Sequence, residues 1–315
     1  MTVLVTGANG FVGRAMCARL VSQGIQYRSV SRIKKSESIH FDPYFVPTID
    51  ADTEWKYALS DVEVVVHLAA RVHVMRESSL DPLAEFRRVN VQGTVNLARQ
   101  AVSAGAKRFI YVSSAKVNGE FTTVGHPFTA DDLPAPADPY GISKFEAEQE
   151  LLRISKETGL ELVIVRSPLI YGPQVGGNFE IMMRWIHSEI PLPLGGISDN
   201  QRSFISLNNF VDLLQLCISH PDAANQIFMA SDGQDLSTRE LLDRLAFAMG
   251  KKSRLFSVPN SFLRLVAYLL DKEDVYLRLC GSLQVDIHKT KVLLSWSPPV
   301  SLEQGIKQTV TGFKN

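Results

Sequence analysis

Cysteine is scarce in this chain, and the three that are present, Cys17, Cys217 and Cys280, lie far apart. Their spacing matches neither a metal-binding motif nor a disulfide framework, so we predict no metal site and a reducing compartment. Net charge is also absent, because 33 basic residues balance 33 acidic ones. Bulk charge therefore gives no attraction for nucleic acid, and we expect no nucleic-acid partner.

Long hydrophobic runs are missing as well. The longest apolar stretch, 262–270, is too short to span a bilayer and is interrupted by Arg264. The chain opens on a strand pattern and shows neither the basic start nor the cleavage site of a signal peptide. We expect a soluble cytoplasmic protein with no membrane insertion. Its 315 residues suffice for one large α/β domain or two unequal lobes.

The strongest signal lies in the first residues of the chain. A β-branched run at 2–6 predicts a buried strand, and the apolar spacing of 12–23 predicts a helix directly after it. Between them lie Gly7, Gly10 and Gly13, in the order G-x-x-G-x-x-G. The first permits a tight turn, the second lets a pyrophosphate approach the backbone, and the third lets the helix pack close to the strand. The stretch predicts a dinucleotide-binding turn, with the pyrophosphate on the helix N-terminus.

The second predicted strand, 26–30, ends in Ser31 and Arg32, with Lys34 and Lys35 beyond. In this arrangement the residue at the strand end faces the adenosine ribose, where an acid would bind the 2′-hydroxyl of NAD. No acid stands here, and an arginine offers a planar fork for a 2′-phosphate. The pattern favours NADP(H), with NAD(H) possible; the alternative is a solvated basic loop.

Strand and helix patterns alternate through the first half of the chain. Further strands are predicted at 46–49, 62–70, 108–113 and 161–166, with helices at 81–104 and 140–158. Asp138 and Pro139 form the start signal of the second helix. The alternation predicts an α/β fold with a doubly wound parallel sheet.

The pattern changes after residue 173. We predict a dinucleotide-binding domain over 1–173, with a return segment at about 202–230. A smaller, mixed substrate-binding lobe is predicted from 174–201 and 231–315, covering the carboxyl edge of the sheet. Within it, Ser237 and Glu240 form a capping-box pattern at the start of a helix.

Tyr140 and Lys144 are four residues apart on a predicted helix and share one face. A free tyrosine titrates near pH ~10, and a neighbouring lysine cation with an oxidised nicotinamide would favour its phenolate. Lys144 can also donate to the nicotinamide ribose. Ser114 stands at a predicted strand end, where its hydroxyl can donate to the same substrate oxygen. The set predicts an acid–base site; the alternative is an accidental surface pair of Tyr and Lys.

Together these motifs resemble the extended short-chain dehydrogenase/reductases, and within them the nucleotide-sugar epimerase, dehydratase and reductase group. The resemblance covers nearly all of the chain. It rests on the glycine turn, His67-Leu68-Ala69-Ala70, Asn90, Ser113-Ser114, Tyr140-x-x-x-Lys144, Arg166-Ser167-Pro168 and Tyr171-Gly172-Pro173. It implies catalytic roles for Ser114, Tyr140 and Lys144, and a homodimer formed through the helices at 81–104 and 140–158.

Motifs and resemblance together give two sets of binding residues. The cofactor is predicted to contact Gly7, Asn9, Gly10, Phe11, Val12, Gly13, Ser31, Arg32, Asp50, Ala51, Leu68, Ala69, Ala70, Asn90, Tyr140, Lys144 and Pro168. A UDP-sugar substrate is predicted to contact Arg71, Ser114, Ala115, Lys116, Tyr140, Asn178, Arg202 and Arg278. A guanidinium such as that of Arg202 forks well onto a phosphate. His67 is expected to be a hydrogen-bonded strand-end residue, not a catalyst.

Residues that differ from those of the family's better-known members limit the reactions that the resemblance allows. The 4,6-dehydratases carry an acidic pair after the catalytic hydroxyl residue, where this chain has Ala115 and Lys116. The UDP-galactose 4-epimerases commonly keep an acid at the second strand end and a late Arg-x-Gly-Asp segment, where this chain has 280–282 in the sequence Cys-Gly-Ser. Segments 116–119, 191–195 and 281–286 are similar to bacterial O-antigen enzymes that reduce a UDP-4-keto-6-deoxy-N-acetylhexosamine.

The first interpretation is therefore an NADP(H)-dependent reductase of the C4 ketone of such a sugar. A 4-epimerase of a UDP-hexose or UDP-N-acetylhexosamine, with retained NAD, is the alternative built on the same residues. A non-catalytic binder that senses NADP(H) is the third, although it would need no acid–base group. The fate of the cofactor distinguishes the first two interpretations, because a reductase consumes NADPH and an epimerase recycles its cofactor.

Overall fold

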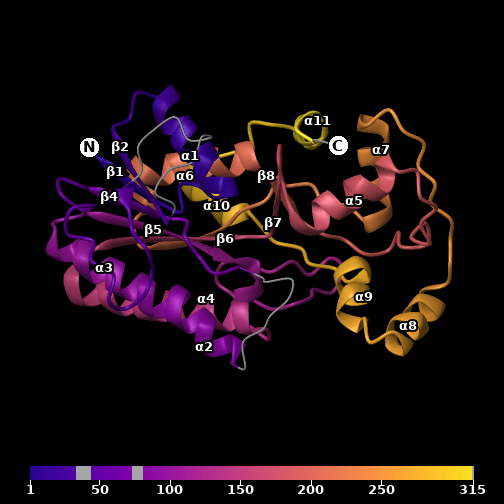
Figure 1. The fold of residues 1–315 in the computed structure, drawn as a ribbon, viewed down its shortest axis with the longest axis horizontal. Coiled ribbons are helices and arrows are strands. Elements are labelled where there is room, and N and C mark those ends of the chain that lie inside the picture. Colours follow the sequence, from indigo (N-terminus) through magenta and orange to yellow (C-terminus); the bar gives the residue numbers. More distant parts are fainter. Residues whose placement is uncertain (33–43, 73–80, 314–315) are drawn as a thin grey trace.

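The computed structural model describes residues 1–32, 44–72 and 81–313, and its arrangement is shown in Figure 1. A parallel sheet with helices on both faces occupies one side of the molecule, and a smaller set of helices occupies the other. Lys34 and Lys35, which the sequence places beyond the second strand, lie outside the described residues.

The large sheet has seven strands in the order β3-β2-β1-β4-β5-β6-β9, all parallel. The strands are β1 (Val3–Thr6), β2 (Tyr27–Ser31), β3 (Tyr44–Phe45), β4 (Val64–His67), β5 (Arg108–Ser114), β6 (Glu161–Ser167) and β9 (Gln226–Met229). The strand order runs outward in both directions from β1. This confirms the doubly wound α/β fold that the strand–helix alternation predicts.

Alternate side chains of the strands enter two separate cores. In β1, Val3 and Val5 pack on one face with α1 (Phe11–Ser22), α6 (Leu207–Ser219) and α10 (His288–Leu294), whereas Leu4 packs on the other. That second face is covered by α3 (Thr94–Ser103) and α4 (Pro139–Thr158), as Figure 1 shows. Strands buried on both faces explain the nearly continuous apolar runs in the sequence.

Two predicted elements differ from those observed. The third strand is Tyr44–Phe45, not 46–49, because its partner β2 ends at Ser31 and offers no ladder beyond that point. The predicted helix at 81–104 consists of α2 (Pro82–Phe86), a π-helical stretch at Arg87–Gly93, and α3. π-Helical turns are often found at functional sites.

The smaller lobe is built around a third core. The helices α5 (Gly177–His187), α7 (Thr238–Ala248) and α11 (Leu302–Thr311) surround it. β7 (Leu169–Tyr171) and β8 (Phe204–Ser206) form a two-stranded parallel sheet of their own, outside the large one. Ser237 and Glu240 form the predicted capping box at the start of α7.

Two more helices, α8 (Asn260–Leu269) and α9 (Glu273–Cys280), pack against each other at the far end of this lobe (Figure 1). The chain then returns to the large sheet, where α10 contacts β9. The predicted division into two domains stays a prediction. Among the described residues, no helix combines the length and apolar composition needed to cross a bilayer.

Candidate active site

The turn between β1 and α1 leaves no space for side chains at its glycines. Gly7 has φ +68°, and a Cβ added there would lie 2.8 Å from the backbone nitrogen of Ala69. A Cβ on Gly13 would lie 2.1 Å from the carbonyl oxygen of Gly7. The backbone of β1, α1 and the end of β4 therefore meet at van der Waals contact, which only glycine allows at these positions.

The N-terminus of α1 presents unbonded N–H groups to this turn. Gly10 is the N-cap, and the first helical hydrogen bond runs from Arg14 N–H to its carbonyl oxygen over 3.0 Å. The N–H groups of Phe11, Val12 and Gly13 thus have no partner inside the helix. No described side chain caps the helix either. A cramped glycine cradle beside free N–H groups fits a dinucleotide diphosphate.

The end of β2 carries a buried Ser31 followed by an exposed Arg32. The side-chain amide of Asn9 donates to the Ser31 hydroxyl. The amide oxygen of Asn9 is buried and has no hydrogen-bond partner among the described residues. These three predicted cofactor residues therefore lie together at the strand end nearest the glycine turn.

The end of β4 is fixed by hydrogen bonds to Thr6. The Thr6 hydroxyl accepts hydrogen bonds from the backbone N–H groups of Leu68, at 3.2 Å, and of Ala69, at 3.3 Å. His67 bonds Thr6 through Nδ1 at 2.7 Å and Thr94 through Nε2 at 3.0 Å. Burial lowers the pKa of His67 to about 3, so its ring is neutral and fully hydrogen-bonded, as expected from the sequence.

Asn90, in the π-helical stretch, ties the end of β4 to α4. Its side chain accepts from the Arg71 N–H at 2.8 Å and donates to the Arg71 carbonyl and the Ser143 hydroxyl, both at 3.0 Å. The Arg71 guanidinium lies 5.6 Å from the ring centroid of Phe86, and that ring lies edge-on to Tyr140 at 6.0 Å. Arg71 is thereby held on the side of the site where Tyr140 lies.

Two other predicted cofactor residues follow β3. Asp50 accepts a hydrogen bond from the Thr53 hydroxyl at 3.0 Å, and its carboxylate lies 3.6 Å from the Arg88 guanidinium. Ala51 is exposed in the same turn. The Asp50 carboxylate is thus engaged locally, and a contact with the adenine stays a prediction.

Tyr140 and Lys144 stand on the first turns of α4, which packs against β5, the strand that ends in Ser114. The Lys144 ammonium donates to the carbonyl oxygen of Val112 over 2.8 Å. It lies 4.6 Å from the ring centroid of Tyr111 and 5.9 Å from that of Tyr140. The Ser114 hydroxyl accepts from the Lys116 N–H at 3.2 Å. The strand end and the helix start therefore bring the predicted acid–base groups to one place.

Burial dominates the protonation of this site. Desolvation by burial raises the pKa of Tyr140 well above its ordinary value, and the Asp138 carboxylate adds to that rise. Burial lowers the pKa of Lys144 to about 7, against the attraction of Glu148. Without a cofactor, these groups favour the protonated phenol of Tyr140. The expectation that Lys144 together with an oxidised nicotinamide favours the phenolate stays a prediction.

A row of alternating charges leads away from Tyr140, and we call Asp138, Lys116, Glu120 and Arg202 the charge row. The Lys116 ammonium lies 2.5 Å from Asp138 and 3.1 Å from Glu120. Burial lowers the pKa of Arg202, and the charge of Glu120 opposes that change. Sequence reasoning missed Glu120, because it lies in a loop whose pattern carries no signal for a tertiary ion pair.

The guanidinium of Arg202 donates to the carbonyl oxygen of Gly281 at 3.0 Å, just beyond the last turn of α9. Arg278 is exposed in that same last turn. The Arg202 side chain therefore lies at the end of α9, the helix whose last turn carries Arg278. Asn178 is exposed in the first turn of α5, and no described contact joins it to this pair.

Two further predicted binding residues have buried side chains that carry no hydrogen-bonding group. Ala115 is buried directly after β5, and Pro168 links β6 to β7.

A buried ion pair that the sequence did not reveal joins β6 to α4. Arg166 donates to Glu148 at 2.6 and 3.0 Å, and both side chains are buried. Arg166 also donates to Asn118 at 3.1 Å.

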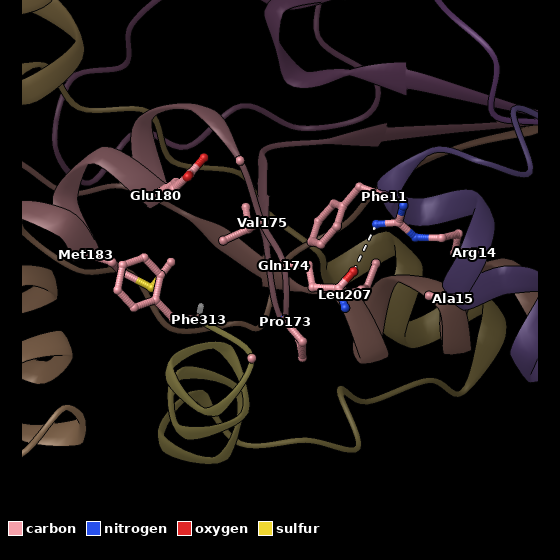
Figure 2. Close-up of a pocket in the computed structure, with 12 residues that line it drawn as sticks. Phe11, Arg14, Ala15, Pro173, Gln174, Val175, Glu180, Met183, Leu207 and Phe313 are labelled. Atoms are coloured by element: carbon pink, nitrogen blue, oxygen red, sulfur yellow. Dashed lines mark hydrogen bonds between the residues drawn. The ribbon is translucent and has the colours of Figure 1, made fainter. Parts of the chain in front are cut away.

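A separate cavity of about 700 Å³ lies between α1, the start of α5 and the end of α11. Figure 2 shows the Arg14 guanidinium reaching the Gln174 amide across it, with a hydrogen bond of 3.2 Å. Apolar side chains such as Phe11, Met183 and Phe313 line the rest. Ser114, Tyr140 and Lys144 do not line this cavity, so it is distinct from the acid–base site.

Comparison with known proteins places this geometry in a family. The sequence profile of the NAD dependent epimerase/dehydratase family matches residues 3–230. A relative from Vibrio cholerae, described as UDP-glucose 4-epimerase, is 46% identical over 315 residues, which cover 99% of this chain and 95% of the relative.

Solved structures show the same fold over nearly the whole length. UDP-glucose 4-epimerase from Thermotoga maritima, solved with UDP-glucose, has a TM-score of 0.78 at 24% identity, over 99% of this chain and 98% of that one. UDP-glucuronic acid 4-epimerase from Bacillus cereus, solved with NAD, has a TM-score of 0.80 at 21% identity, over 99% and 96%.

Proposed function

The chain belongs to the NAD dependent epimerase/dehydratase family, and we propose that it is a 4-epimerase of a UDP-hexose or UDP-N-acetylhexosamine that retains NAD. It is an enzyme of the nucleotide-sugar short-chain dehydrogenase/reductase group. The observation that carries the proposal is the 46% identity to the Vibrio cholerae UDP-glucose 4-epimerase over 99% of this chain. The family profile ends at residue 230, whereas this likeness continues through the lobe predicted to bind the sugar.

The residues at the acid–base site support a reversible oxidation at C4 of the sugar. A nicotinamide bound here would supply the acceptor, and later the donor, of the hydride at C4. With Lys144 and an oxidised nicotinamide favouring its phenolate, Tyr140 would take the proton of the C4 hydroxyl during oxidation and give it back after the keto sugar has turned over. Ser114 donates a hydrogen bond to that oxygen, and Lys144 lies close enough to Tyr140 to support its negative charge.

We assign the diphosphate of the substrate to Arg202 and to Arg278, which lies in the last turn of α9. One N–H of the Arg202 guanidinium donates to the Gly281 carbonyl, and the same planar group has further N–H donors. Arg278, in the last turn of α9, would add a second positive charge. UDP should therefore compete with the sugar nucleotide, and Arg202→Ala should weaken both in calorimetry. UDP binding no tighter than inorganic phosphate would count against this assignment.

A reductase that consumes NADP(H) is the second candidate. One observation favours it: Ser31 and an exposed Arg32 stand where an acid would bind the adenosine ribose of NAD. If it holds, NADPH should bind more tightly than NADH, and Arg32→Ala should remove the difference. Each charge-assisted hydrogen bond to a phosphate contributes about 1.5–3 kcal/mol, less where water screens it, so the preference should be about tenfold and should fall with added salt.

The identity of the bound nucleotide tests the proposal. The purified protein should release NAD on denaturation, and should convert UDP-glucose or UDP-N-acetylglucosamine to its C4 epimer without added cofactor. A protein that releases no nucleotide and oxidises NADPH with a UDP-4-keto sugar would be the reductase instead. We further propose a homodimer through the helical segment 81–104 and α4, by analogy with the family, which sedimentation of the same sample will test.

A further inference from the structure

The ammonium group of Lys144 belongs to a buried side chain. That side chain is only 3% exposed, and it lies on α4 where this helix packs against β5. Burial disfavours the charged form of a lysine, and it lowers the pKa of Lys144 to about 7. Whether Lys144 keeps its charge therefore depends on the groups that surround it.

Polar groups around Lys144 compensate little of the lost hydration. Among the described residues, the ammonium donates one hydrogen bond, to the carbonyl oxygen of Val112 at 2.8 Å. Glu148, one turn further along α4, attracts it, but both oxygens of that carboxylate accept hydrogen bonds from Arg166 of β6. His67 of β4 is neutral, because burial lowers its pKa to about 3. The ammonium needs a further source of attraction.

The ring of Tyr111 supplies that attraction. The ammonium nitrogen lies over this ring, 4.6 Å from its centroid, and only 5.9 Å from the centroid of Tyr140. A cation within about 6 Å of an aromatic centroid is attracted by the negative face of the ring, and more strongly where water is excluded. Tyr111 is fully buried, and burial raises its pKa well above the ordinary value, so its ring stays a neutral phenol.

The strands of the large sheet fix the position of the Tyr111 ring. In the register of β4 and β5, His67 lies directly opposite Tyr111. The two rings are inclined by only 18°, with their centroids 6.0 Å apart. Hydrogen bonds from both ring nitrogens, to Thr6 and to Thr94, prevent the imidazole from turning. The Tyr111 ring therefore lies between fixed neighbours beside the glycine turn and the ammonium of Lys144.

The hydroxyl of Tyr111 has no part in this arrangement. It is buried and has no hydrogen-bond partner among the described residues. An unpaired buried hydroxyl does not stabilise a fold, so the useful part of this side chain is the face of its ring. Phenylalanine keeps that face, whereas leucine fills part of the same space without it.

We propose that Tyr111 is a positioning residue, whose ring face holds the ammonium of Lys144 charged and in place at the acid–base site. The proposal rests on the role of Lys144 in the proposed function. Tyr111 acts through Lys144 and needs no contact with the sugar or with the cofactor. It also joins the acid–base site to the anchored imidazole of His67, and so to the end of β4.

Nitrogen NMR of the full chain, made with isotope-labelled lysine, tests the proposal without relying on turnover. The resonance that is missing from Lys144→Met identifies the group. In Tyr111→Leu the pKa of Lys144 should fall by about one pH unit, which corresponds to about 1.4 kcal/mol. Tyr111→Phe should titrate as the wild type does. Circular dichroism checks folding, and Tyr111→Met, which also lacks a ring, replaces Tyr111→Leu if that variant does not fold.

Phe109→Leu is the matched control. Phe109 is a second fully buried ring of β5, in the same core as Tyr111, and its centroid lies 5.8 Å from that of His67. No contact in the described part of the chain joins it to Lys144. Phe109→Leu should lose stability about as Tyr111→Leu does, and should leave the titration of Lys144 unchanged. An equal fall of the pKa in both leucine variants, or no fall in Tyr111→Leu, overturns the proposal.

The pH profile of kcat separates this proposal from the proposed function. If turnover needs a charged Lys144, the limb on which kcat falls with rising pH should move to lower pH in Tyr111→Leu. At a fixed pH on that limb, kcat should be up to about tenfold lower, because one pH unit changes the charged fraction by that factor. Tyr111→Phe should keep the wild-type profile. A shifted titration with an unshifted profile would support the contact with Tyr111 and contradict the role of Lys144 in the proposed function.

Discussion

The ammonium of Lys116 lies 2.5 Å from the carboxylate of Asp138, the residue that caps the helix carrying Tyr140. Asp138 uses its other oxygen to accept from the Gly141 N–H at 2.6 Å. One carboxylate therefore joins the loop after Ser114 to the start of α4. We infer that this link helps to set the relative positions of Ser114 and Tyr140.

Asp138→Asn keeps an acceptor for the helix cap but removes the ion pair with Lys116. We expect kcat to fall about tenfold, because a charge-assisted hydrogen bond contributes roughly 1.5–3 kcal/mol to holding the loop. KM for the sugar nucleotide should change little. Steady-state kinetics measure both, with Glu157→Gln as a control at the exposed far end of the same helix. Equal kcat in Asp138→Asn and wild type would show that the ion pair of Lys116 with Asp138 has no role in positioning Ser114 and Tyr140.

Tyr140→Phe removes the proposed proton donor and keeps the ring that packs against Phe86. Loss of general acid–base catalysis should lower kcat by roughly 10²–10⁴. Cofactor content after purification should match the wild type, because the backbone turn at Gly7 is untouched. Turnover within a few-fold of wild type would remove Tyr140 from the mechanism.

Glu148→Gln breaks the buried pair with Arg166 and leaves a guanidinium without its counter-charge in the core. Breaking a buried pair from one side costs about 3–5 kcal/mol of unfolding free energy. Urea unfolding should therefore show a large loss for Glu148→Gln and little change for the exposed Glu157→Gln. The double variant Glu148→Leu with Arg166→Met should recover part of the loss. Similar losses in Glu148→Gln and Glu157→Gln would mean that the pair stabilises nothing.

Lys144 should make the stability of the protein depend on pH. Burial lowers its pKa in the folded chain to about 7 from an ordinary 10.5, so between these values the unfolded state binds more protons. The free energy of unfolding should rise with pH in that window, by at most about 1.4 kcal/mol per pH unit from this group. Lys144→Met lacks the group, so its stability relative to wild type should fall from pH ~7 to ~9. Parallel curves for the two proteins would contradict the buried-lysine assignment.

Local signals in the sequence were sufficient for the elements that position the site. The glycine spacing predicts the β1–α1 turn because a side chain at any of these glycines would approach backbone atoms a few residues away or at the end of the adjacent strand too closely. Asp138 followed by Pro139 predicts the start of α4, and the structure has the cap there. The strand at 44–45 could not be placed, because its length depends on where β2 ends.

Tertiary packing accounts for what the sequence did not predict. The charge row and the pair of Arg166 with Glu148 join residues that no periodic pattern relates. Burial raises the pKa of Tyr140 well above its ordinary value, and no pattern in the sequence shows how deeply a side chain is buried. The reaction was least predictable of all, because the predicted acid–base set of Ser114, Tyr140 and Lys144 fits a 4-epimerase and a 4-ketoreductase equally well.

Conversion of UDP-glucose deuterated at C4, without added nicotinamide cofactor, tests the central claim most directly. If the protein is a 4-epimerase, the hydride leaves C4 and returns to the same carbon. The UDP-galactose formed should then retain its deuterium at C4, with no net change in nicotinamide absorbance over many turnovers. Absence of the C4 epimer from both this substrate and deuterated UDP-N-acetylglucosamine, with stoichiometric oxidation of NADPH by a UDP-4-keto sugar, would contradict the account.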